Sequence, residues 1–312
     1  MADNPNISMN NADNLPIVDA HQHFWNLAQN HYPWLAGEPP ANFRYGDVAP
    51  LRRNYLPRDY FADAADHRVV ATIHMEAEWD PRDPVGETRW LDGLRRETGF
   101  PTAAIGQAWF GRADIAAVLA GHAQYDFMRG VRQKPKAAAS PDAFVSGAPG
   151  SMSDPNWRAG YALLERHGLS YDLQAPWWHM GEAADLARDF PRIPIIVNHT
   201  ALPSDRSAEG LARWRKALET VAAQPNVSLK ISGIGLRGER WSMEKNAPIV
   251  RDAIRIFGAK RCMFASNFPV DGLVGSFDTI FSGFKRIVAD LPMDQQRALL
   301  HDNAVRIYRL NL

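Results

Sequence analysis

Eight short apolar segments alternate along the chain with segments of helical pattern. Each apolar segment has the length of a strand, and many of the helical stretches end in Gly or Pro, residues that commonly terminate helices. Strands that alternate with helices indicate a parallel sheet, and eight is the number of strands that closes a (β/α)8 barrel. The predicted strands cover residues 17–25, 69–79, 101–110, 128–133, 169–175, 194–201, 227–235 and 262–269.

The fold class that follows is α/β, with the architecture of a (β/α)8 TIM barrel. A doubly wound open sheet is the competing architecture, and it usually carries a glycine-rich phosphate loop after its first strand. The sequence at that place, HQHFWNLAQNHYPW, has no such loop. A barrel can also accommodate most of the 312 residues in one unit. We therefore expect a disordered N-terminal tail at residues 1–14 and a single barrel domain at residues 15–312.

The composition argues against several classes of partner. Lys and Arg together number 35, as do Asp and Glu, so the balanced charge predicts no nucleic-acid partner. The chain has no apolar run long enough to span a bilayer, so we expect no membrane association. Cys262 is the only cysteine and is interpreted as a small buried residue. A chain with no internal disulfide and no signal-peptide core at its start is expected to be cytoplasmic.

Two histidines, His21 and His23, stand one residue apart at the end of the first predicted strand. Side chains at positions i and i+2 of a strand point to the same face. Both imidazoles are therefore expected to aim at one point, which is a metal, a substrate or a packing contact.

Polar residues stand in the same place on most of the other predicted strands. Catalytic groups of TIM barrels collect at the C-terminal ends of the strands. A buried polar group without a partner costs about 1–3 kcal/mol, so a polar barrel mouth predicts a functional site. These residues are His74, Glu76 and Glu78 on the second strand, Arg129 and Arg132 on the fourth, Asp172 and Gln174 on the fifth, Asn198 and His199 on the sixth, Lys230 and Ser232 on the seventh, and Ser266 and Asn267 on the eighth. The irregular segment from Asn26 to about Arg58 is typical of a lid or binding loop.

An ordered set of motifs resembles the amidohydrolase superfamily: HxH on the first strand, VNHT on the sixth and MFASNFPVD on the eighth. The stretches GVRQ, HMEAEWDPRDPVGETRWL and NAVRIYRL resemble its amidohydrolase-2 branch, including fuconolactonase-like sugar lactonases and pyrone-dicarboxylate lactonases. The resemblance runs from about Ile17 to Leu310. It implies that residues 15–312 form an amidohydrolase-type barrel and that the protein is a hydrolase of carboxylic esters in small lactones, with a place in carbohydrate catabolism.

The chain departs from the family pattern at two positions. The fifth strand reads YDLQ and lacks a histidine, and Asn267 stands where the family has its catalytic aspartate. An amide cannot act as a base near pH 7. Glu76 is the expected replacement, because burial can raise the pKa of a carboxyl group toward the working range. Asp271 can reach the position of Asn267 only if the chain turns back after Pro269.

The resemblance and the strand positions together give a set of expected site residues. The catalytic candidates are His21, His23, Glu76, His199, Asn267 and Asp271. The substrate-binding candidates are Arg129, Arg132, Asp172, Gln174, Trp177 and Lys230, with Trp178 as a further wall. His21, His23 and Glu76 are the candidate ligands of one divalent metal ion, with zinc favoured by the ligand types. Metal-free hydrolysis is equally compatible with the two missing ligands.

Two other functions stay open at this point. The first is a metal-dependent decarboxylase of a small aromatic or unsaturated acid, which in the family depends on the missing aspartate. The second is a sugar-acid binder without catalysis, because Asn267 replaces that aspartate. The sequence does not choose among sugar lactones, pyrones and muconolactone-like rings, and a homo-oligomer stays open as well.

Overall fold

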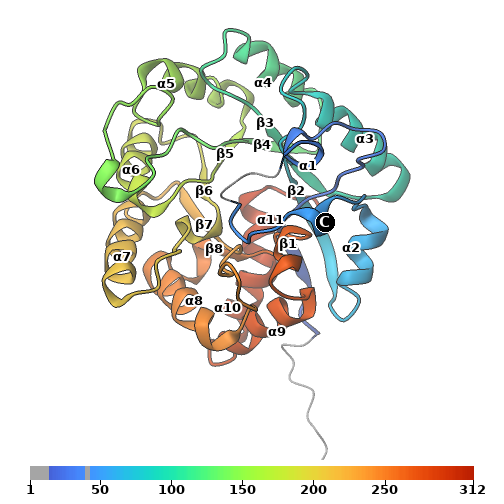
Figure 1. The fold of residues 1–312 in the computed structure, drawn as a ribbon, viewed down its shortest axis with the longest axis vertical. Coiled ribbons are helices and arrows are strands. Elements are labelled where there is room, and N and C mark those ends of the chain that lie inside the picture. The colour runs from blue at the N-terminus through green and yellow to red at the C-terminus, as the bar shows by residue number, and fades with distance from the viewer. Residues whose placement is uncertain (1–13, 39–42) are drawn as a thin grey trace, which may run out of the picture.

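The computed structural model describes residues 14–38 and 43–312, so the predicted tail at residues 1–14 lies outside the described residues except for Asn14. The predicted (β/α)8 barrel is confirmed, because eight parallel strands pair in chain order from β1 to β8 (Figure 1). The strands are β1 (Ile17–Gln22), β2 (Val69–Met75), β3 (Ala103–Gln107), β4 (Met128–Gln133), β5 (Ser170–Leu173), β6 (Ile195–Val197), β7 (Val227–Ile231) and β8 (Cys262–Phe264).

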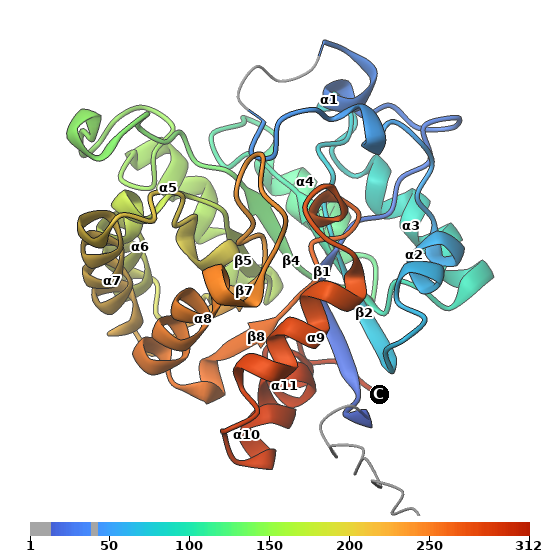
Figure 2. The same ribbon diagram turned by 60° about the horizontal axis from the view of Figure 1, so that its bottom comes forward.

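The helices form an outer layer around the strands (Figures 1 and 2). Three of the longer ones begin at a serine, because the side chains of Ser207, Ser242 and Ser276 accept hydrogen bonds from backbone N–H groups of the first turn. The helices are α1 (Pro33–Ala36), α2 (Pro57–Asp63), α3 (Gly86–Thr98), α4 (Ile115–Ala123), α5 (Pro155–Ala162), α6 (Met180–Asp189), α7 (Ala208–Ala222), α8 (Met243–Phe257), α9 (Phe277–Ile287), α10 (Met293–Arg297) and α11 (Asn303–Ile307). Among the described residues, no helix is both long and apolar enough to cross a bilayer.

Two of the three apolar clusters include most of the buried apolar side chains of these layers. The larger one includes side chains of the strands and of the surrounding helices, such as Trp214 and Leu218 of α7. The smaller one includes strand residues and Tyr308, which follows α11. Its buried members are Val18, Ala20, Ala71, Ile73, Met75, Ala103, Ile105, Ile196, Met263, Ala265, Ala304, Tyr308 and Leu310. Cys262 is fully buried, as predicted.

The residues that follow β8 close the barrel against β1. The backbone N–H of Asn267 donates to the carbonyl of His21 at 2.8 Å, and the N–H of His23 donates to the carbonyl of Phe268 at 2.8 Å. Ser266 adds a side-chain contact, because its Oγ donates to Asp19 Oδ2 at 2.6 Å. This closure sets Asn267 beside the histidine pair.

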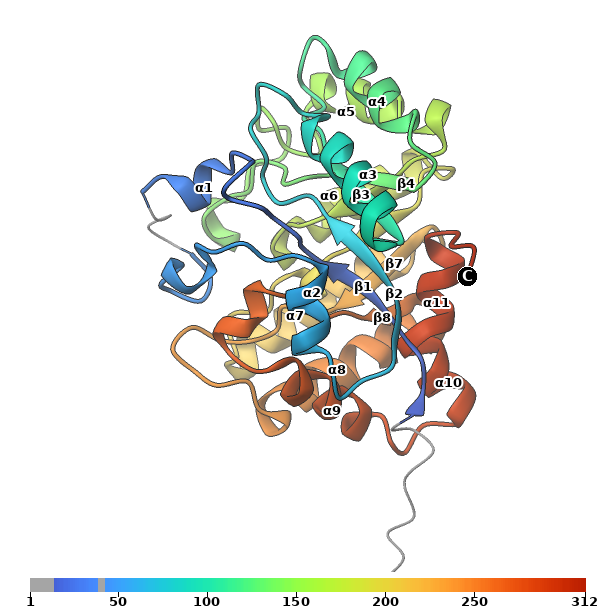
Figure 3. The same cartoon turned by 90° about the vertical axis from the view of Figure 1, so that its right-hand side faces the viewer.

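The segment before α2 reaches the same end of the barrel. Figure 3 shows α1 beyond the C-terminal end of β2, where Trp34 Nε1 donates to the carbonyl of Ala77 at 2.8 Å. Farther along the chain, Arg44 donates from Nη1 to the carbonyl of Gly233 at 2.8 Å. The described parts of the segment between β1 and α2, residues 23–38 and 43–56, therefore reach the barrel mouth.

Candidate active site

A cavity of about 540 Å³ opens among the C-terminal ends of the strands. Its size lies in the range of small-molecule sites. Five cationic or imidazole groups reach it: His23, Arg44, Arg132, Lys134 and His199. The lining residues are His23, Trp34, Phe43, Arg44, Ala77, Glu78, Arg132, Lys134, Gln174, Pro176, Trp178, His199, Leu202, Ser204, Asn267 and Val270.

Three imidazoles meet beside this cavity, and two of them, His23 and His199, line it. The ring centroids of His21 and His23 lie 5.1 Å apart, and those of His21 and His199 lie 4.5 Å apart. His23 is fixed by a 2.8 Å hydrogen bond between its Nδ1 and the carbonyl of Met75, and His199 by a 2.9 Å hydrogen bond between its Nδ1 and Ser232 Oγ. The arrangement leaves Nε2 of His23 and of His199 as the ring nitrogens available to a ligand.

His21 differs from its two neighbours. It is fully buried, and neither of its ring nitrogens has a hydrogen-bond partner among the described residues. Burial lowers its pKa well below the usual range, and the nearby His199 and Lys230 lower it further. His21 is therefore an uncharged imidazole whose two polar atoms are free to bind a ligand or water.

The pKa values of His23 and His199 are also well below the usual range. Burial is the main cause for both, followed by the guanidinium of Arg132 for His23 and that of Arg44 for His199. All three imidazoles are thus uncharged near pH 7.

A break in the regular pairing of β1 with β2 accompanies the histidine pair. Three steps along β1, from Asp19 to Gln22, match two steps along β2, from Thr72 to His74. Such a bulge re-aims the side chains that follow it. Asp19 accepts a hydrogen bond from the Tyr60 hydroxyl of α2 at 2.7 Å, whereas His21 meets His199 at the mouth.

His74 was expected at the mouth with Glu76, but the structure places it elsewhere. Its Nδ1 accepts from the backbone N–H of Phe24 at 3.1 Å, and its Nε2 lies 3.2 Å from Glu87 of α3. His74 is therefore a structural residue between strand and helix.

Glu76 lies at the mouth but is engaged by other groups of the protein. Its Oε1 accepts from Arg132 Nε at 2.5 Å, and its Oε2 accepts from the backbone N–H of Glu78 at 2.8 Å. Arg132 also donates from Nη1 to Gln174 Oε1 at 3.1 Å. The carboxylate of Glu76 therefore orients the guanidinium of Arg132 toward the cavity that both Arg132 and Gln174 line.

Asp271 reaches Asn267 because the chain turns back after Pro269 into a short 3-10 helix at Val270–Leu273. Asn267 Nδ2 donates to Asp271 Oδ1 at 2.6 Å, and the Tyr45 hydroxyl donates to the same oxygen at 3.0 Å. The backbone N–H of Gly233 donates to Asp271 Oδ2 at 3.1 Å. Burial raises the pKa of Asp271 to about 6, while these hydrogen bonds oppose the shift. The carboxylate fixes the amide of Asn267, which lines the cavity.

Gly233 allows two site residues to approach closely. It has a positive φ of +59°, and a Cβ at this position would lie 2.4 Å from Arg44 Nη1 and 2.5 Å from His199 Nδ1. Any larger residue would displace the guanidinium or the imidazole, so the glycine is required here.

The backbone that carries His199 is strained. Four consecutive residues after β6, from His199 to Leu202, have φ between 50° and 57°. A left-handed conformation costs a non-glycine residue about 1–2 kcal/mol, and such strain concentrates at functional sites. The turn directs His199 into the cavity and places Leu202 on its wall.

Asp172 and Lys230 lie inside the barrel but do not line the cavity. Both are fully buried, with Lys230 Nζ 2.7 Å from Asp172 Oδ1. The Tyr308 hydroxyl donates to the same oxygen at 2.9 Å, and so does Asn198 Nδ2. Burial lowers the pKa of Lys230 to about 8. The pair affects the site because the positive charge of Lys230 lowers the pKa of His21.

Two further expected binding residues, Arg129 and Trp177, also lie away from the cavity. The guanidinium of Arg129 donates from Nη1 to the carbonyls of Asp126 and Met128, before and at the start of β4. Trp177 lies under the guanidinium of Arg213, whereas its neighbour Trp178 lines the cavity. Arg44, Tyr45 and Lys134 were missed as site residues. The first two stand in the segment predicted as a lid, and Lys134 follows the GVRQ stretch.

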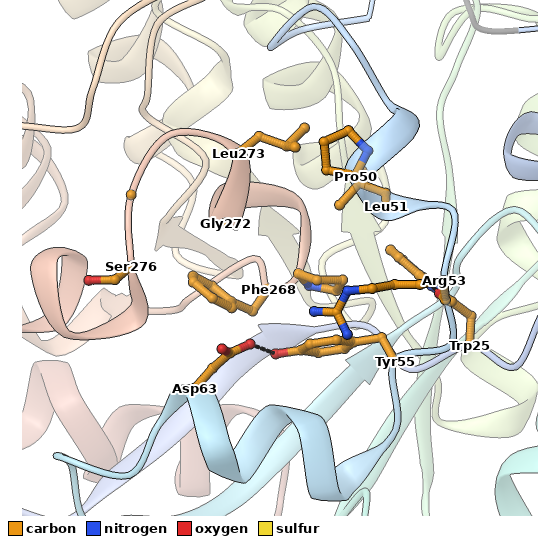
Figure 4. Close-up of a pocket in the computed structure, with 12 residues that line it drawn as sticks. Trp25, Pro50, Leu51, Arg53, Tyr55, Asp63, Phe268, Gly272, Leu273 and Ser276 are labelled. Carbon is orange, nitrogen blue, oxygen red and sulfur yellow. Dashed lines mark hydrogen bonds between the residues drawn. The ribbon is translucent and has the colours of Figure 1, made fainter.

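A separate cavity of about 270 Å³ lies between the loops before α2 and before α9 (Figure 4). The Tyr55 hydroxyl donates to Asp63 at 2.7 Å there, and the Arg53 guanidinium lies over the Tyr55 ring. None of the histidines lines this cavity. Within it, the Tyr55 hydroxyl and the Asp63 carboxylate are bonded to each other.

The donor set at the mouth does not fit a zinc site. Within residues 14–38 and 43–312, no group of three or more His, Cys, Asp and Glu side chains is placed to hold a metal ion. Glu76, one of the three expected ligands, is bound to Arg132, and Asp271 is held by Asn267, Tyr45 and Gly233. The cationic Arg132 and Lys230 also act on His21. No step is therefore derived through a metal ion.

A (β/α)8 barrel with converging imidazoles and an arginine at its mouth defines a class of barrel enzymes acting on small molecules. Residues 18–310 match the family model Amidohydro_2, described as amidohydrolase, so the chain belongs to this amidohydrolase family. The resemblance stated from the motifs is confirmed.

Three relatives illustrate what the chain is similar to. It is 42% identical over 297 residues to the uncharacterized protein y4mH of Sinorhizobium fredii, covering 95% of this chain and 99% of that protein. It is 28% identical to L-fucono-1,5-lactonase of Burkholderia ambifaria, covering 83% of this chain and 82% of that enzyme. A crystal structure of an amidohydrolase from Burkholderia multivorans with bound zinc superposes with a TM-score of 0.76 at 26% identity, covering 95% and 99% of the two chains.

Proposed function

We propose that the protein hydrolyses a small lactone by attack of water on the ring carbonyl. The observation that carries the proposal is the uncharged, fully buried His21 without a hydrogen-bond partner at either ring nitrogen, next to His199 at the cavity. Polar atoms of this kind are normally paired, so an unpaired imidazole beside a cavity favours a ligand or water as its partner. The similarity to L-fucono-1,5-lactonases supports the same reaction.

His199 is the proposed general base. It lines the cavity, and its Nδ1 bonds to Ser232, which leaves Nε2 to accept a proton from water. The water oxygen attacks the carbonyl carbon, and the ring C–O bond then breaks. The imidazolium returns the proton to the leaving alkoxide, and the product is a hydroxy acid. An imidazole that is uncharged near pH 7 is in the correct form for the first step.

Arg132 is the proposed electrophilic group. Its planar guanidinium is oriented by Glu76 and Gln174 and can donate to the carbonyl oxygen as negative charge develops there. Glu76 in this proposal is a positioning residue, because its two oxygens already accept from Arg132 and from Glu78 N–H. Asn267, held by Asp271, offers its amide oxygen to a substrate hydroxyl. Trp178 provides a wall for the ring, and Arg44 and Lys134 suit a carboxylate or hydroxyls of the substrate.

A panel of sugar, pyrone and muconolactone-type lactones, assayed by acid release with a pH indicator, tests the proposal. We expect turnover of at least one lactone, and His199→Asn should reduce kcat/KM by about 100-fold or more, as expected for the loss of a general base. His167→Asn, which changes a histidine outside the cavity, should retain the activity of the parent protein. No turnover of any lactone would overturn the proposal.

Three further measurements separate the alternative functions. Metal analysis of the purified protein, with the panel repeated after chelation and after addition of zinc, tests whether the ion bound in the Burkholderia multivorans relative also assists here. Release of carbon dioxide from carboxylated aromatic acids would support a decarboxylase instead. Thermal stabilisation by sugar acids with no turnover would support a binding protein.

A further inference from the structure

A second cavity of about 420 Å³ adjoins the proposed reaction site. The two cavities share four lining residues: Trp34, Glu78, Arg132 and Lys134. Arg132 therefore reaches both. Each cavity is by itself large enough for a small-molecule ligand, within the usual range of about 300–1,000 Å³. A single small lactone needs only one of them.

Tryptophan side chains dominate the wall of the second cavity. Trp79 and Trp109 line it together with the shared Trp34. Trp34 is fixed by its hydrogen bond to Ala77, and Trp79 packs edge-on against Tyr32 at a centroid distance of 5.3 Å. Trp34 and Trp79 are therefore held in place by the protein and present apolar surface without needing to be ordered by a ligand.

Polar side chains stand among the tryptophans. Gln107 is nearly buried and donates from Nε2 to the carbonyl of Trp79 at 2.9 Å. Its side chain also lines the cavity. Glu78 and Lys134 form an ion pair at the boundary of the two cavities, with side chains 46% and 44% exposed. A pair that is half in solvent can rearrange at little cost.

We propose that the second cavity is a subsite for a second pyranose ring, so that the substrate is the lactone of a disaccharide acid. A pyranose has apolar C–H faces, which suit the electron-rich faces of indoles, and hydroxyl edges, which suit amide and carboxylate groups. The mixture of Trp79 and Trp109 with Gln107 and Glu78 matches both features. A purely aliphatic substituent would leave the polar groups without partners.

This inference rests on the proposed lactone hydrolysis and adds the substrate class. The first cavity would hold the lactone ring and the second the glycosyl group attached to it. The shared Glu78 and Lys134 lie where the bond between the two rings would pass, and the hydroxyls flanking that bond can take up hydrogen bonds from the ion pair.

Two probe lactones test the proposal: glucono-1,5-lactone, with one ring, and cellobiono-1,5-lactone, with two. We expect the two-ring lactone to have the higher kcat/KM. Trp109→Ala should lower kcat/KM for the two-ring lactone by about tenfold, the loss expected for one aromatic contact, and leave the one-ring lactone unchanged. Trp109→Phe, which retains an aromatic face, should recover most of the loss. Trp178→Ala is the matched control in the first cavity and should lower both rates.

Equal effects of Trp109→Ala on the two lactones would overturn the proposal, as would a two-ring lactone that reacts no faster than glucono-1,5-lactone. If neither lactone reacts, the proposed function fails, and the subsite is then judged by binding. Titration with cellobionic acid, followed by tryptophan fluorescence, should show affinity that Trp109→Ala reduces about tenfold relative to gluconic acid. Absence of that difference would overturn the subsite independently of catalysis.

Discussion

The inside of the barrel contains two groups of buried polar side chains that differ in whether other side chains of the protein bind them. Deeper in the barrel, the carboxylate of Asp172 has three partners: Lys230, Tyr308 and Asn198. At the mouth, His21 is equally buried, yet both of its ring nitrogens lack a partner among the described residues. The two groups are near enough for the charge of Lys230 to lower the pKa of His21.

The presence or absence of such partners distinguishes polar groups that serve the fold from polar groups that are candidates for the reaction. A polar group whose partners are all supplied by the protein stabilises the fold or at least costs little, because its desolvation is offset. A polar group without such partners reduces stability unless a ligand or water completes it. We therefore propose that the Asp172 network serves the fold and the His21 cluster the proposed reaction, although the sequence places both at strand ends.

The largest expected effect comes from breaking the deeper group. Lys230→Met leaves the carboxylate of Asp172 buried without its cation, which should reduce the free energy of unfolding by about 3–5 kcal/mol. Urea denaturation measures the change. Arg251→Ala is the control, because its ion pair with Asp290 has side chains 55% and 61% exposed. Its loss should cost no more than about 1 kcal/mol. If the two variants lost the same free energy of unfolding, the Asp172 network would contribute no more to the fold than an exposed ion pair.

A smaller change in stability, of opposite sign, is expected at the mouth. His21→Leu removes two unpaired nitrogens from a buried position, so the free energy of unfolding should stay the same or rise by about 1–2 kcal/mol. Hydrolysis of the best lactone should fall at the same time by about 100-fold, if the imidazole contacts water or substrate.

The matched control for His21→Leu is His122→Leu. His122 is also fully buried, but its Nδ1 bonds to Thr88 Oγ1 at 2.8 Å and its Nε2 to the carbonyl of Gln107 at 2.9 Å. Replacing His122 leaves Thr88 Oγ1 and the carbonyl of Gln107 without a hydrogen-bond partner, so the free energy of unfolding should fall by about 1–3 kcal/mol. If His21→Leu were as destabilising as His122→Leu, His21 would be a structural residue.

The same contrast explains how far the sequence could predict the fold. The strand starts were predicted closely, and the apolar runs that begin at Ile195 and Cys262 are buried on both faces. The strand ends were placed too late: β6 ends at Val197 instead of residue 201, and β8 at Phe264 instead of residue 269. At these ends the backbone adopts positive φ, at His199 and at Asn267 among others, and contacts distant in sequence hold it there.

The site was predictable where side-chain alternation or chain proximity determines it. The convergence of His21, His23 and His199 needed only the barrel topology. The orientation of His74 depends on its contacts with the backbone of Phe24 and with Glu87 of α3, which no local pattern indicates. The contact of Tyr45 with Asp271 joins residues 226 positions apart, and it depends on how the segment before α2 crosses the mouth.

The smallest expected effect concerns Asp271, the carboxylate that holds Asn267 at the mouth. Its pKa in the folded protein is about 6, raised by burial from a usual value of 3.8. Between these two values the unfolded chain has lost the proton and the folded chain has kept it, so this residue's contribution to stability falls as the pH rises. Other groups titrate in the same interval, including the buried histidines, whose lowered pKa values act in the opposite direction. The stability difference between the parent protein and Asp271→Asn isolates the carboxyl group.

We expect that difference to shift by about 1 kcal/mol in favour of Asp271→Asn between pH 5 and pH 8, measured by urea denaturation at both values. Asp278→Asn, at an exposed carboxyl group, provides the control and should show a smaller shift. Because Arg44 and Tyr45 both act on Asp271, removing Tyr45's hydroxyl by Tyr45→Phe should raise the pKa of Asp271 further and widen the interval upward. A shift of the opposite sign for Asp271→Asn would mean that its partners stabilise the ionised form more than burial disfavours it, and Asp271 would then resemble Asp172 rather than His21.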